Sequence, residues 1–393
     1  MSIRSHSKTA GGSELVVFSH AGPVPLPELQ PALAALWRHA SEGVQAEAPE
    51  ALALACLWNL VAFHSNPKRT RGDSGGEAQH IEGLLERVTA SLPARVIHLE
   101  EWRDEEAPSP GREVEAWVST HCLHRGGGGH LVTCEAINLA GYGEKGHAHF
   151  PALVRALLMP DLPVALLWLD DVPRKGRVLG QLLQLCERMI IDVQHTSDPQ
   201  TLPAVHDLLR STGARVVDLG WLRLGALRHL VADFFDPPGR AEQLGRLERI
   251  AIATSPQGRN TGLLLLGWLL SRCGLHEARA VHPGPADDAW RWQVPQGGGV
   301  FPLDFSVREG YGGLDGIFSI DIQAGGDTFS LHDVDPEHMA VKGPERDQPR
   351  VALREPDDAG LVVAALGRDP AGRVFAEALA VAAALVETEQ WNR

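Results

Sequence analysis

The chain has 393 residues, of which 44% are hydrophobic, and its 50 acidic and 36 basic residues give a formal net charge of −14. This length and apolar content are sufficient for about two domains with buried cores, and they exclude a disordered or fibrous protein. The negative charge and the lack of any dense run of lysine and arginine argue against nucleic acid and anionic membranes as partners. The five cysteines have no CxxC spacing, which favours a reducing compartment over a disulfide framework.

The N-terminal segment, residues 1–13, is polar and lacks the apolar core of a signal peptide, so we expect it to be flexible. The longest apolar run, residues 262–270, is about half as long as a membrane-spanning helix. We therefore expect a cytoplasmic protein without a membrane partner.

The first predicted elements lie between residues 50 and 140. Residues 50–64, EALALACLWNLVAFH, are apolar nearly all round and predict a helix inside a core. Apolar residues at helical spacing predict a second helix over 78–92, and the run RVIHLE predicts a strand over 95–100. Strands over 114–122 and 130–140 are expected to form an antiparallel hairpin.

From residue 150 onwards, helices and strands alternate. We expect helices over 150–158, 180–188, 201–212 and 225–235, and strands over 163–170, 189–193 and 215–221. Apolar strands alternating with helices of about ten residues predict a mixed, largely parallel sheet covered by helices on both faces. The predicted fold is therefore α/β, with a three-layer N-terminal domain over residues 14–240.

The pattern changes after residues 236–239, DPPG, which predict a turn. A predicted strand over 246–254 and a buried helix over 260–274 are followed by short runs separated by glycine-rich turns. These runs predict strands over 290–294, 300–307, 314–324 and 327–333, then a loop without readable structure over 335–350 and two final helices. We expect a smaller α+β domain with antiparallel strands over residues 241–393.

Residues 121–134, HCLHRGGGGHLVTC, contain enough ligand atoms for a zinc site, from His121, Cys122, His124, His130 and Cys134. Alternation along a strand sends neighbouring side chains to opposite faces, so His121 and Cys122 are poorly placed to bind one ion. The glycines lie between two strands and not before a helix, which argues against a phosphate-binding loop. We interpret the stretch as a hairpin tip, with a zinc-stabilised scaffold as an alternative.

The loop 254–262 lies between a predicted strand and a predicted helix and is the better candidate for binding an anion. It offers Arg259 together with Asn260 and Thr261 at the start of the helix. The simpler interpretation is that Asn260 or Thr261 caps the helix.

The pair Asp170-Asp171 follows a predicted strand, where α/β enzymes often keep binding groups. A metal or sugar contact is one interpretation, and a solvated turn before Val172-Pro173 is the other. The motifs GxSxG, HExxH and the nucleotide-binding glycine loops are absent. The residues therefore predict no catalytic, cofactor or metal site.

Four tryptophans, Trp117, Trp168, Trp221 and Trp268, fall in or beside predicted elements. Each is expected in a core, because large aromatic side chains dominate buried area. Trp168 and Trp221 lie near strand ends and are the better candidates for an interface, where tryptophan is enriched.

Six segments support a resemblance to a known family. They are LWNLVAF (57–63), LPARVIHLE (92–100), VTCEAINL (132–139), LVRALLMPDLPVALLWLDD (153–171), VVDLGWLRLGALRHLVADFFDP (216–237) and GLLLLGWLLSRCG (262–274). In this order they resemble the OpcA family of glucose-6-phosphate dehydrogenase assembly proteins. The positions that carry the resemblance are Asn59, Arg95, Cys134, Glu135, Asp161, Pro163, Trp168, Asp218, Trp221 and Arg228.

This resemblance implies a non-catalytic partner of glucose-6-phosphate dehydrogenase, the first enzyme of the oxidative pentose phosphate pathway, that supports the active oligomer or activates it. It implies no cofactor, and it makes the motif positions, above all Trp168 and Trp221, candidates for contact with the dehydrogenase. In photosynthetic relatives the family is linked to thiol control, and Cys134 matches the family cysteine. The alternative is a sugar-phosphate-binding enzyme or ligand-binding regulator that uses Asp170 and Asp171 or the loop 254–262.

Overall fold

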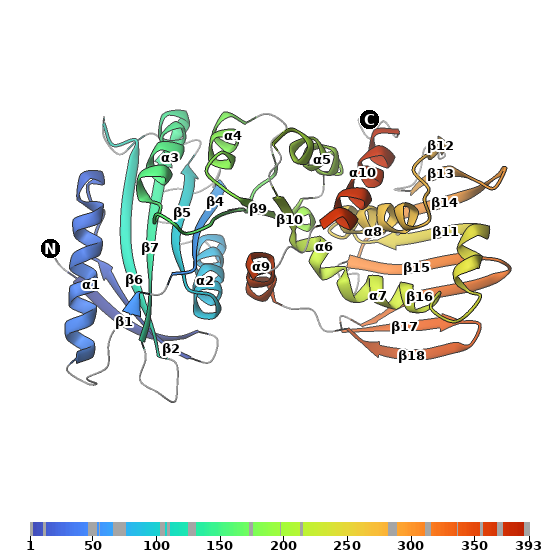
Figure 1. Ribbon diagram of the computed structural model, residues 1–393, viewed down its shortest axis with the longest axis horizontal. Coiled ribbons are helices and arrows are strands. Elements are labelled where there is room, and N and C mark those ends of the chain that lie inside the picture. The colour runs from blue at the N-terminus through green and yellow to red at the C-terminus, as the bar shows by residue number, and fades with distance from the viewer. Residues whose placement is uncertain are drawn as a thin grey trace. The chain divides into compact units, whose positions relative to one another are not determined.

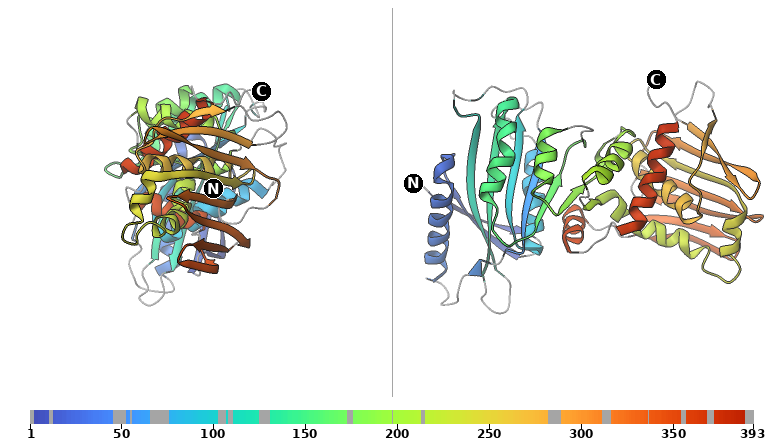
Figure 2. Two further views of the ribbon diagram at one scale, coloured as in Figure 1. Left: turned by 90° about the vertical axis from the view of Figure 1, so that its right-hand side faces the viewer. Right: turned by 45° about the horizontal axis from the view of Figure 1, so that its top comes forward.

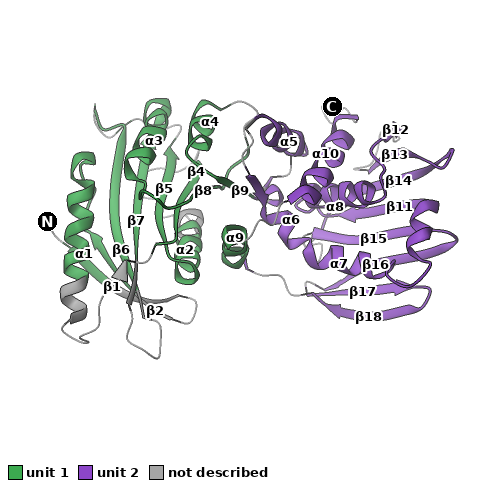
Figure 3. Ribbon diagram, in the orientation of Figure 1, with its two compact units in different colours: residues 1–191, 358–367 green, residues 192–357, 368–393 purple. Residues whose placement is uncertain are grey.

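A computed structural model shows two sheets with helices packed on them, which confirms the mixed α/β class (Figure 1). The described residues are 3–10, 13–45, 53, 54, 56–65, 76–102, 107, 111–124, 131–172, 176–196, 198–212, 215–281, 289–310, 316–335, 337–353, 357–367 and 372–388. The chain divides into unit 1, residues 1–191 and 358–367, and unit 2, residues 192–357 and 368–393 (Figure 3). The division after residue 191 differs from the boundary expected near residue 240.

Unit 1 is built on a mixed sheet with the strand order β1-β2-β6-β7-β5-β4-β8-β9. Strands β4, β5, β7, β8 and β9 run parallel, whereas β1, β2 and β6 form an antiparallel edge. The strands are β1 (Ile3–Ala10), β2 (Ser13–His20), β4 (Trp58–Ser65), β5 (Ala94–Trp102), β6 (Val114–His124), β7 (Leu131–Tyr142), β8 (Val164–Trp168) and β9 (Arg188–Ile191), and the short β3 (Ala53–Leu54) pairs with β7.

Two expectations for unit 1 are wrong. The helix expected over 50–64 is wrong for the described residues of that range, because β4 occupies Trp58–Ser65 in the middle of the sheet. A strand covered on both faces is apolar throughout and cannot be told from a buried helix by periodicity. Most of the segment 1–13, expected to be flexible, forms strand β1. The expected hairpin of β6 and β7 is confirmed.

Helices lie on both faces of the unit 1 sheet. They are α1 (Leu29–Gln45), preceded by the turn η1 (Leu26–Glu28), then α2 (Gly76–Ser91), α3 (Gly143–Leu157), α4 (Arg177–Leu183) and α9 (Asp358–Gly367). Helix α3 contacts β5, β7 and α4, whereas α2 contacts α9. The connection β4-α2-β5 and the connection β7-α3-β8 run in opposite directions along the sheet, so right-handed crossovers place α2 and α3 on opposite faces (Figure 2).

This reversal of direction creates a switch point between β4 and β8. The chain fills the sheet from β4 through β5 to β7 and then returns to β8 on the other side of β4. In open α/β sheets, ligands bind beyond the carboxyl ends of the strands at such a point. The carboxyl ends of β4 and β8 are therefore the place in unit 1 where this rule predicts a ligand.

Unit 2 contains a second sheet with the order β12-β13-β14-β11-β15-β16-β17-β18. Its central strand β11 runs parallel to β14 and antiparallel to β15. The strands of unit 2 are β10 (Arg215–Asp218), β11 (Leu247–Thr254), β12 (Arg279–Val281), β13 (Ala289–Gln296), β14 (Gly299–Val307), β15 (Ile317–Ala324), β16 (Asp327–Asp335), β17 (His338–Gly343) and β18 (Arg346–Ala352).

The helices of unit 2 are α5 (Thr201–Thr212), α6 (Leu219–Arg223), α7 (Gly225–Asp233), α8 (Arg259–Arg272) and α10 (Gly372–Thr388), with the turns η2 (Val193–His195) and η3 (Ala241–Arg246). Helix α8 contacts β11 and α10. The segment 335–350, expected to be a loop, instead contains β17 and most of β18. The expected strand over 215–221 ends at Asp218, so Trp221 lies in α6.

Candidate functional site

Asn59, the first motif position, is fully buried at the start of β4. Its side-chain amide donates to the carbonyl oxygens of Met159, at 3.0 Å, and Leu162, at 3.3 Å, and its Oδ1 accepts from the Met159 N–H at 2.8 Å. These bonds fix the turn before β8, where Asp161 adopts a positive φ of 63° and the Pro163 carbonyl accepts from the Asn59 N–H. The three motif positions thus hold one turn in shape.

Arg95 and Glu135 form a buried ion pair between β5 and β7. The Arg95 Nε donates to Glu135 Oε2 at 3.0 Å, and its Nη1 donates to the Leu157 carbonyl oxygen at 2.8 Å. A buried charge is tolerated only when it is paired and hydrogen-bonded, and both conditions hold here. The pair joins two strands to the end of α3 and exposes almost no surface to a partner.

Cys134 is also buried, and burial raises the pKa of its thiol to about 12, with the nearby Cys56 as the next cause. Burial raises the pKa of Cys56 to about 11. The thiolate is the reactive form of cysteine, so both thiols are unreactive near neutral pH in this conformation.

The carboxyl ends of β4 and β8 bring together the groups at the switch point. Trp168 stacks on Phe63 with ring centroids 4.0 Å apart and an interplanar angle of 14°, and its indole N–H donates to the Asp171 carbonyl oxygen. The Ser65 hydroxyl donates to the carboxylate of Asp170. Asp170 therefore binds the neighbouring strand end, while Trp168, only 4% exposed, belongs to the core.

Histidines and carboxylates of β4, β5 and α3 continue this edge of the sheet. His98 Nε2 lies 3.0 Å from His64 Nδ1, and His64 Nε2 lies 3.7 Å from Glu100 Oε1. His147 Nδ1 lies 2.8 Å from Glu101 Oε1. His98 and His64 are within hydrogen-bonding distance, whereas the 3.7 Å between His64 and the partly exposed Glu100 is longer than a hydrogen bond.

Burial, and secondarily the neighbouring His64, lowers the pKa of His98 to about 3. His98 is therefore neutral at physiological pH, and its ring is hydrogen-bonded to His64 and to Asn138. Sequence reasoning missed this group, because 18 histidines give no spacing that marks it and only the pairing of β4 with β5 brings His64 beside His98.

Asp218 lies fully buried at the end of β10 in unit 2. Its carboxylate accepts from the Val193 N–H at 3.0 Å and caps α6 by accepting from the Trp221 N–H at 2.9 Å. Burial and the neighbouring Asp192 raise the pKa of Asp218 to about 7, although the two N–H groups favour its charged form. Like the buried motif residues Asn59, Arg95 and Glu135 of unit 1, Asp218 therefore stabilises the fold of the chain.

Arg228 differs from the other motif residues. Its guanidinium lies 3.4 Å from the centroid of the Trp221 ring, in a groove of about 410 Å3 between α6, α7, α8 and α10. We call this the Trp221 groove; it is lined by Trp221, Gly225, Arg228, His229, Ala232, Trp268, Gly372, Arg373 and Val374. Of the predicted pair Trp168 and Trp221, Trp221 lines this groove, although its side chain is only 2% exposed.

Arg228 forms no ion pair with any carboxylate of the described residues. Within the described part of the chain its guanidinium makes no hydrogen bond or ion pair. It makes a cation–π contact with the Trp221 ring. Burial lowers the pKa of Arg228 to about 10, so it remains a cation at neutral pH. A half-buried cation that stacks on tryptophan is well placed to receive an anionic group.

The predicted anion site at residues 254–262 is closed. Asn260 and Thr261 are fully buried, and the Asn260 amide lies 2.8 Å from the Thr196 carbonyl oxygen. The expectation that one of them caps α8 is wrong, because the cap residue is Gly258 and no side chain caps the helix. Arg259 lies over the Trp290 ring at 5.5 Å.

The zinc alternative concerned residues 121–134, of which 125–130 lie outside the described residues. His121 Nε2 lies 3.0 Å from the Ser119 hydroxyl, and Cys122 is buried. Across the described ranges, no three His, Cys, Asp or Glu side chains are grouped so that they could hold a metal ion. None of the described helices is long and apolar enough to cross a membrane.

Comparison with protein families gives two adjacent matches. Residues 86–206 match the family described as glucose-6-phosphate dehydrogenase subunit N-terminal domain, and residues 214–379 match the corresponding C-terminal domain. Between them the matches extend over both compact units.

Curated relatives support the same assignment. A protein from Nostoc punctiforme, named as the proposed OxPP cycle protein OpcA, is 29% identical over 52% of this chain and 44% of its own length. Its namesake from Synechocystis sp. is 27% identical over 48% of this chain and 39% of its own length. The chain thus matches less than half the length of these relatives.

Solved structures show only a distant likeness. A proposed oxidoreductase from Magnetospirillum magnetotacticum gives a TM-score of 0.43 at 11% identity, covering 85% of this chain and 99% of that chain. Biliverdin reductase from Synechocystis sp. gives a TM-score of 0.41 at 9% identity, covering 84% of this chain and 97% of that chain. No functional argument follows from similarity at this level.

Proposed function

The chain belongs to the OpcA family of glucose-6-phosphate dehydrogenase subunits, and on this premise we propose that it binds glucose-6-phosphate dehydrogenase and supports its active oligomer in the cytoplasm. It acts in the oxidative pentose phosphate pathway without catalysing a reaction itself. The observation that carries the contact site is the Arg228 guanidinium in the Trp221 groove, which stacks on Trp221 and has no ion-pair partner among the residues that the structure describes.

The groove has the chemistry of a protein contact. Tryptophan and arginine are the residues most enriched among those that dominate binding energy, and the groove offers Arg228 and the half-buried Trp268. Trp221 is only 2% exposed and supports the Arg228 guanidinium from inside the groove. Val374 is 39% exposed at its edge, so the cation has an apolar neighbour. We therefore expect a carboxylate of the dehydrogenase, next to an apolar side chain, to bind here.

Arg228 gains most from such a carboxylate because its guanidinium is already partly desolvated. An ion pair formed there loses less hydration than one formed between two fully exposed groups, so more of the Coulomb attraction remains. The Trp221 ring holds the guanidinium in place before binding, which lowers the entropy cost of the contact.

Activation follows from population shift. A protein that binds the active oligomer of the dehydrogenase better than its inactive form stabilises the active form by the difference in binding free energy and by no more. The chain then needs no catalytic group of its own.

The test measures oligomer size and KM of the dehydrogenase with the wild-type chain, with Arg228→Ala and with a matched control, Arg279→Ala, an exposed arginine of β12 outside the groove. We expect Arg228→Ala to weaken binding by about tenfold or more, as for loss of a charge-assisted contact, and Arg279→Ala to leave it unchanged. Equal binding by all three proteins would exclude the groove, and no effect of the wild-type chain at saturation would exclude the function.

A second candidate function rests on the switch point of unit 1. His64 and Glu100, with Asp170 just after the end of β8, are groups suited to proton transfer on a polyhydroxylated substrate. The carboxylates at this edge disfavour a phosphate, which makes a sugar-phosphate-binding enzyme the weaker proposal. Turnover of sugars or sugar phosphates by the purified chain alone, abolished in Glu100→Gln, would support it.

A further inference from the structure

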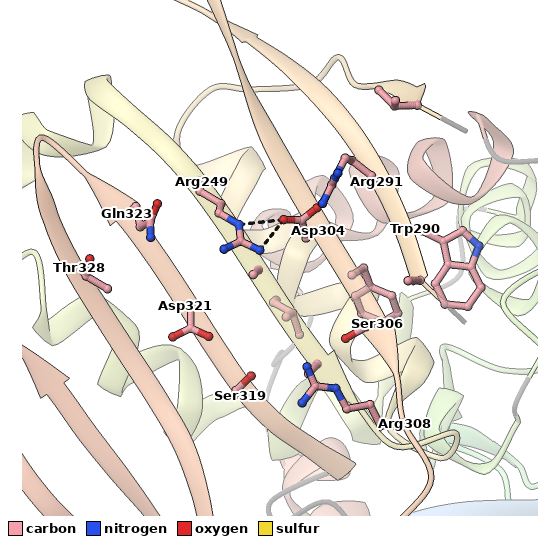
Figure 4. A pocket seen from close by; sticks show the side chains of 16 residues that line it. Arg249, Trp290, Arg291, Asp304, Ser306, Arg308, Ser319, Asp321, Gln323 and Thr328 are labelled. Atoms are coloured by element: carbon pink, nitrogen blue, oxygen red, sulfur yellow. Dashed lines mark hydrogen bonds and ion pairs between the residues drawn. The ribbon is translucent and has the colours of Figure 1, made fainter. Parts of the chain in front are cut away.

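The outer face of the unit 2 sheet contains a hollow of about 600 Å3 that none of the sites described above uses (Figure 4). Its floor is the central strand β11, which directs Ile250 and Ile252 into the core and leaves Ala251 and Ala253 on the outer face. Small side chains on a strand flanked by larger ones create a recess in the sheet.

The strand register defines the walls of this recess. Each floor alanine lies between two polar residues of β14 and β15, in the rows Asp304–Ala251–Asp321 and Ser306–Ala253–Ser319. Neighbouring strands are about 4.8 Å apart, so the two walls stand roughly 10 Å apart, which is wide enough for a small ligand. The volume also lies within the ordinary range of small-molecule sites.

Arginines lie at both ends of the recess (Figure 4). At one end the Asp304 carboxylate binds Arg249 at 2.8 Å and Arg291 at 2.5 Å, joining three strands. At the other end, beyond Ser306, lies the exposed Arg308, whose side chain has no hydrogen bond or ion pair within the described residues. The recess therefore has a fixed charged end and an end with an available guanidinium.

The charge of this recess opposes that of the whole chain. Its lining contains three arginines and two aspartates, whereas the chain has a net charge of −14. Ser306, Ser319, Gln323 and Thr328 add hydroxyl and amide groups to the lining, beside apolar residues such as Phe305 and the floor alanines. One excess positive charge beside several hydroxyl and amide groups matches a ligand that has one anionic group and several hydroxyls.

We propose that the recess binds a small anionic polyol, the chemical class to which sugar phosphates belong, with Arg308 binding the phosphate. A guanidinium binds phosphate oxygens through two parallel N–H bonds, which supplies both affinity and orientation. Asp321 accepts hydrogen bonds from the hydroxyls of the ligand, and the serines and Gln323 both donate and accept them. The site lies in unit 2 and is separate from the Trp221 groove, so the inference does not depend on the proposed function.

An ordinary solvated sheet face does not explain this pattern. The outer face of an antiparallel sheet is normally polar on every strand, because each outward side chain contacts water. Here β11 carries alanines at the two central outward positions, while its neighbours carry charged and hydroxyl groups. The alanines gain nothing from water, and they leave space that a ligand fills.

Isothermal titration of the chain alone, in the millimolar range, tests the proposal with three probes: glucose 6-phosphate, glucose and inorganic phosphate. We expect saturable binding of glucose 6-phosphate that is tighter than binding of either other probe, because each of those lacks half of the contacts. Arg308→Ala should weaken it about tenfold to a hundredfold, the cost of a lost hydrogen bond to a charged group. Ala251→Leu, which fills the floor, should weaken it as well.

The matched control is Lys342→Ala, which removes an exposed cation from β17, two strands beyond the wall formed by β15. Circular dichroism melting of each variant shows that it is folded. No saturable binding by the folded wild-type chain would overturn the proposal, as would equal binding by wild type and Arg308→Ala. Loss of binding in Arg228→Ala instead would assign the anion to the Trp221 groove and exclude the recess.

Discussion

Individual buried polar residues of unit 1 have environments that the sequence alone does not reveal. Asn59 and Arg95 are motif residues that satisfy backbone carbonyls at the ends of other elements, and His98 is kept neutral by burial. The sequence could predict that Asn59 and Arg95 matter, because they belong to family motifs. It could not predict their partners, because the contacting carbonyls lie far away along the chain, in the turn at 158–163 and at the end of α3.

His98 gives a prediction for stability against pH. Its pKa is about 3 in the folded chain and about 6.5 in the unfolded chain, so between these values only the unfolded chain takes up the proton. Stability should therefore fall as pH decreases from about 6.5 towards 3, by up to about 1.4 kcal/mol per pH unit from this group, and should be unaffected by it above pH 6.5. Urea unfolding of wild type and His98→Gln over this pH range measures the free energy of unfolding. Its slope against pH should be shallower for the variant.

The control for this experiment is His276→Gln, which removes an exposed histidine of unit 2. It should keep the wild-type slope of stability against pH, because this variant leaves the buried His98 in place. If His98→Gln also kept the wild-type slope, the neutrality of His98 in the folded chain would be refuted.

At the scale of whole elements, periodicity and turn residues predicted most of the helices and strands, and prediction failed at β4, β17 and β18. Helix α2 and the β6–β7 hairpin follow from periodicity and turn residues. Strand β4 was mistaken for a helix because it is buried on both faces. Strands β17 and β18 were missed because their short sequences, HMAVKG and RDQPRVA, mix polar with apolar residues, and β18 also contains a proline, which normally interrupts a strand.

The candidate sites differ in how far apart along the chain their residues lie. Trp221 and Arg228 are seven positions apart, and local sequence drew attention to both. The recess of unit 2 requires β11 to lie between β14 and β15. Both of these strands lie far from β11 along the chain. No local pattern contains that information.

The packing of α8 on α10 depends on a glycine. A Cβ atom added to Gly267 would lie 2.2 Å from the Ala378 carbonyl oxygen and 2.9 Å from the Ala382 nitrogen. Gly267→Ala should therefore destabilise unit 2 by about 1–3 kcal/mol despite the better helix propensity of alanine, because the backbones must separate. Thermal unfolding of the full chain measures this change.

The matched variant is Gly180→Ala in α4, where an added Cβ meets no atom within 4 Å. It should raise stability by up to about 1 kcal/mol, since alanine restricts the unfolded chain more than glycine does. A stability gain in both variants would mean that α8 and α10 are not in close contact.

At the scale of the whole molecule, the chain passes between its two units more than once. It leaves unit 1 after residue 191, forms most of unit 2, returns to add α9 to unit 1 and then adds α10 to unit 2. Within unit 1, α9 contacts α2, and the Arg188 guanidinium donates to the Ala365 and Leu366 carbonyl oxygens at the end of α9. Composition and periodicity predicted two domains and a final pair of helices, but they could not predict that the two helices belong to different units.

Two truncations separate these roles. A chain that stops after Asp357 lacks both final helices, whereas one that stops after Gly367 lacks only α10 and keeps α9 in unit 1. We expect hydrogen exchange in α2 and β9 to remain slow in the longer truncation and to become fast in the shorter one, because only the shorter one exposes the α2 face and the Arg188 guanidinium. Equal protection in both would show that α9 does not stabilise unit 1.

The return of α9 to unit 1 also affects biosynthesis. A ribosome must translate residues 192–357, nearly the whole of unit 2, before it reaches the helix that completes unit 1. Domains generally fold as units in the order of their synthesis, but here the nascent unit 1 keeps the α2 surface open throughout that interval. Nascent chains that stall within residues 192–357 should therefore expose an apolar surface on α2. Chaperones and proteases recognise such surfaces, so incomplete chains should be degraded.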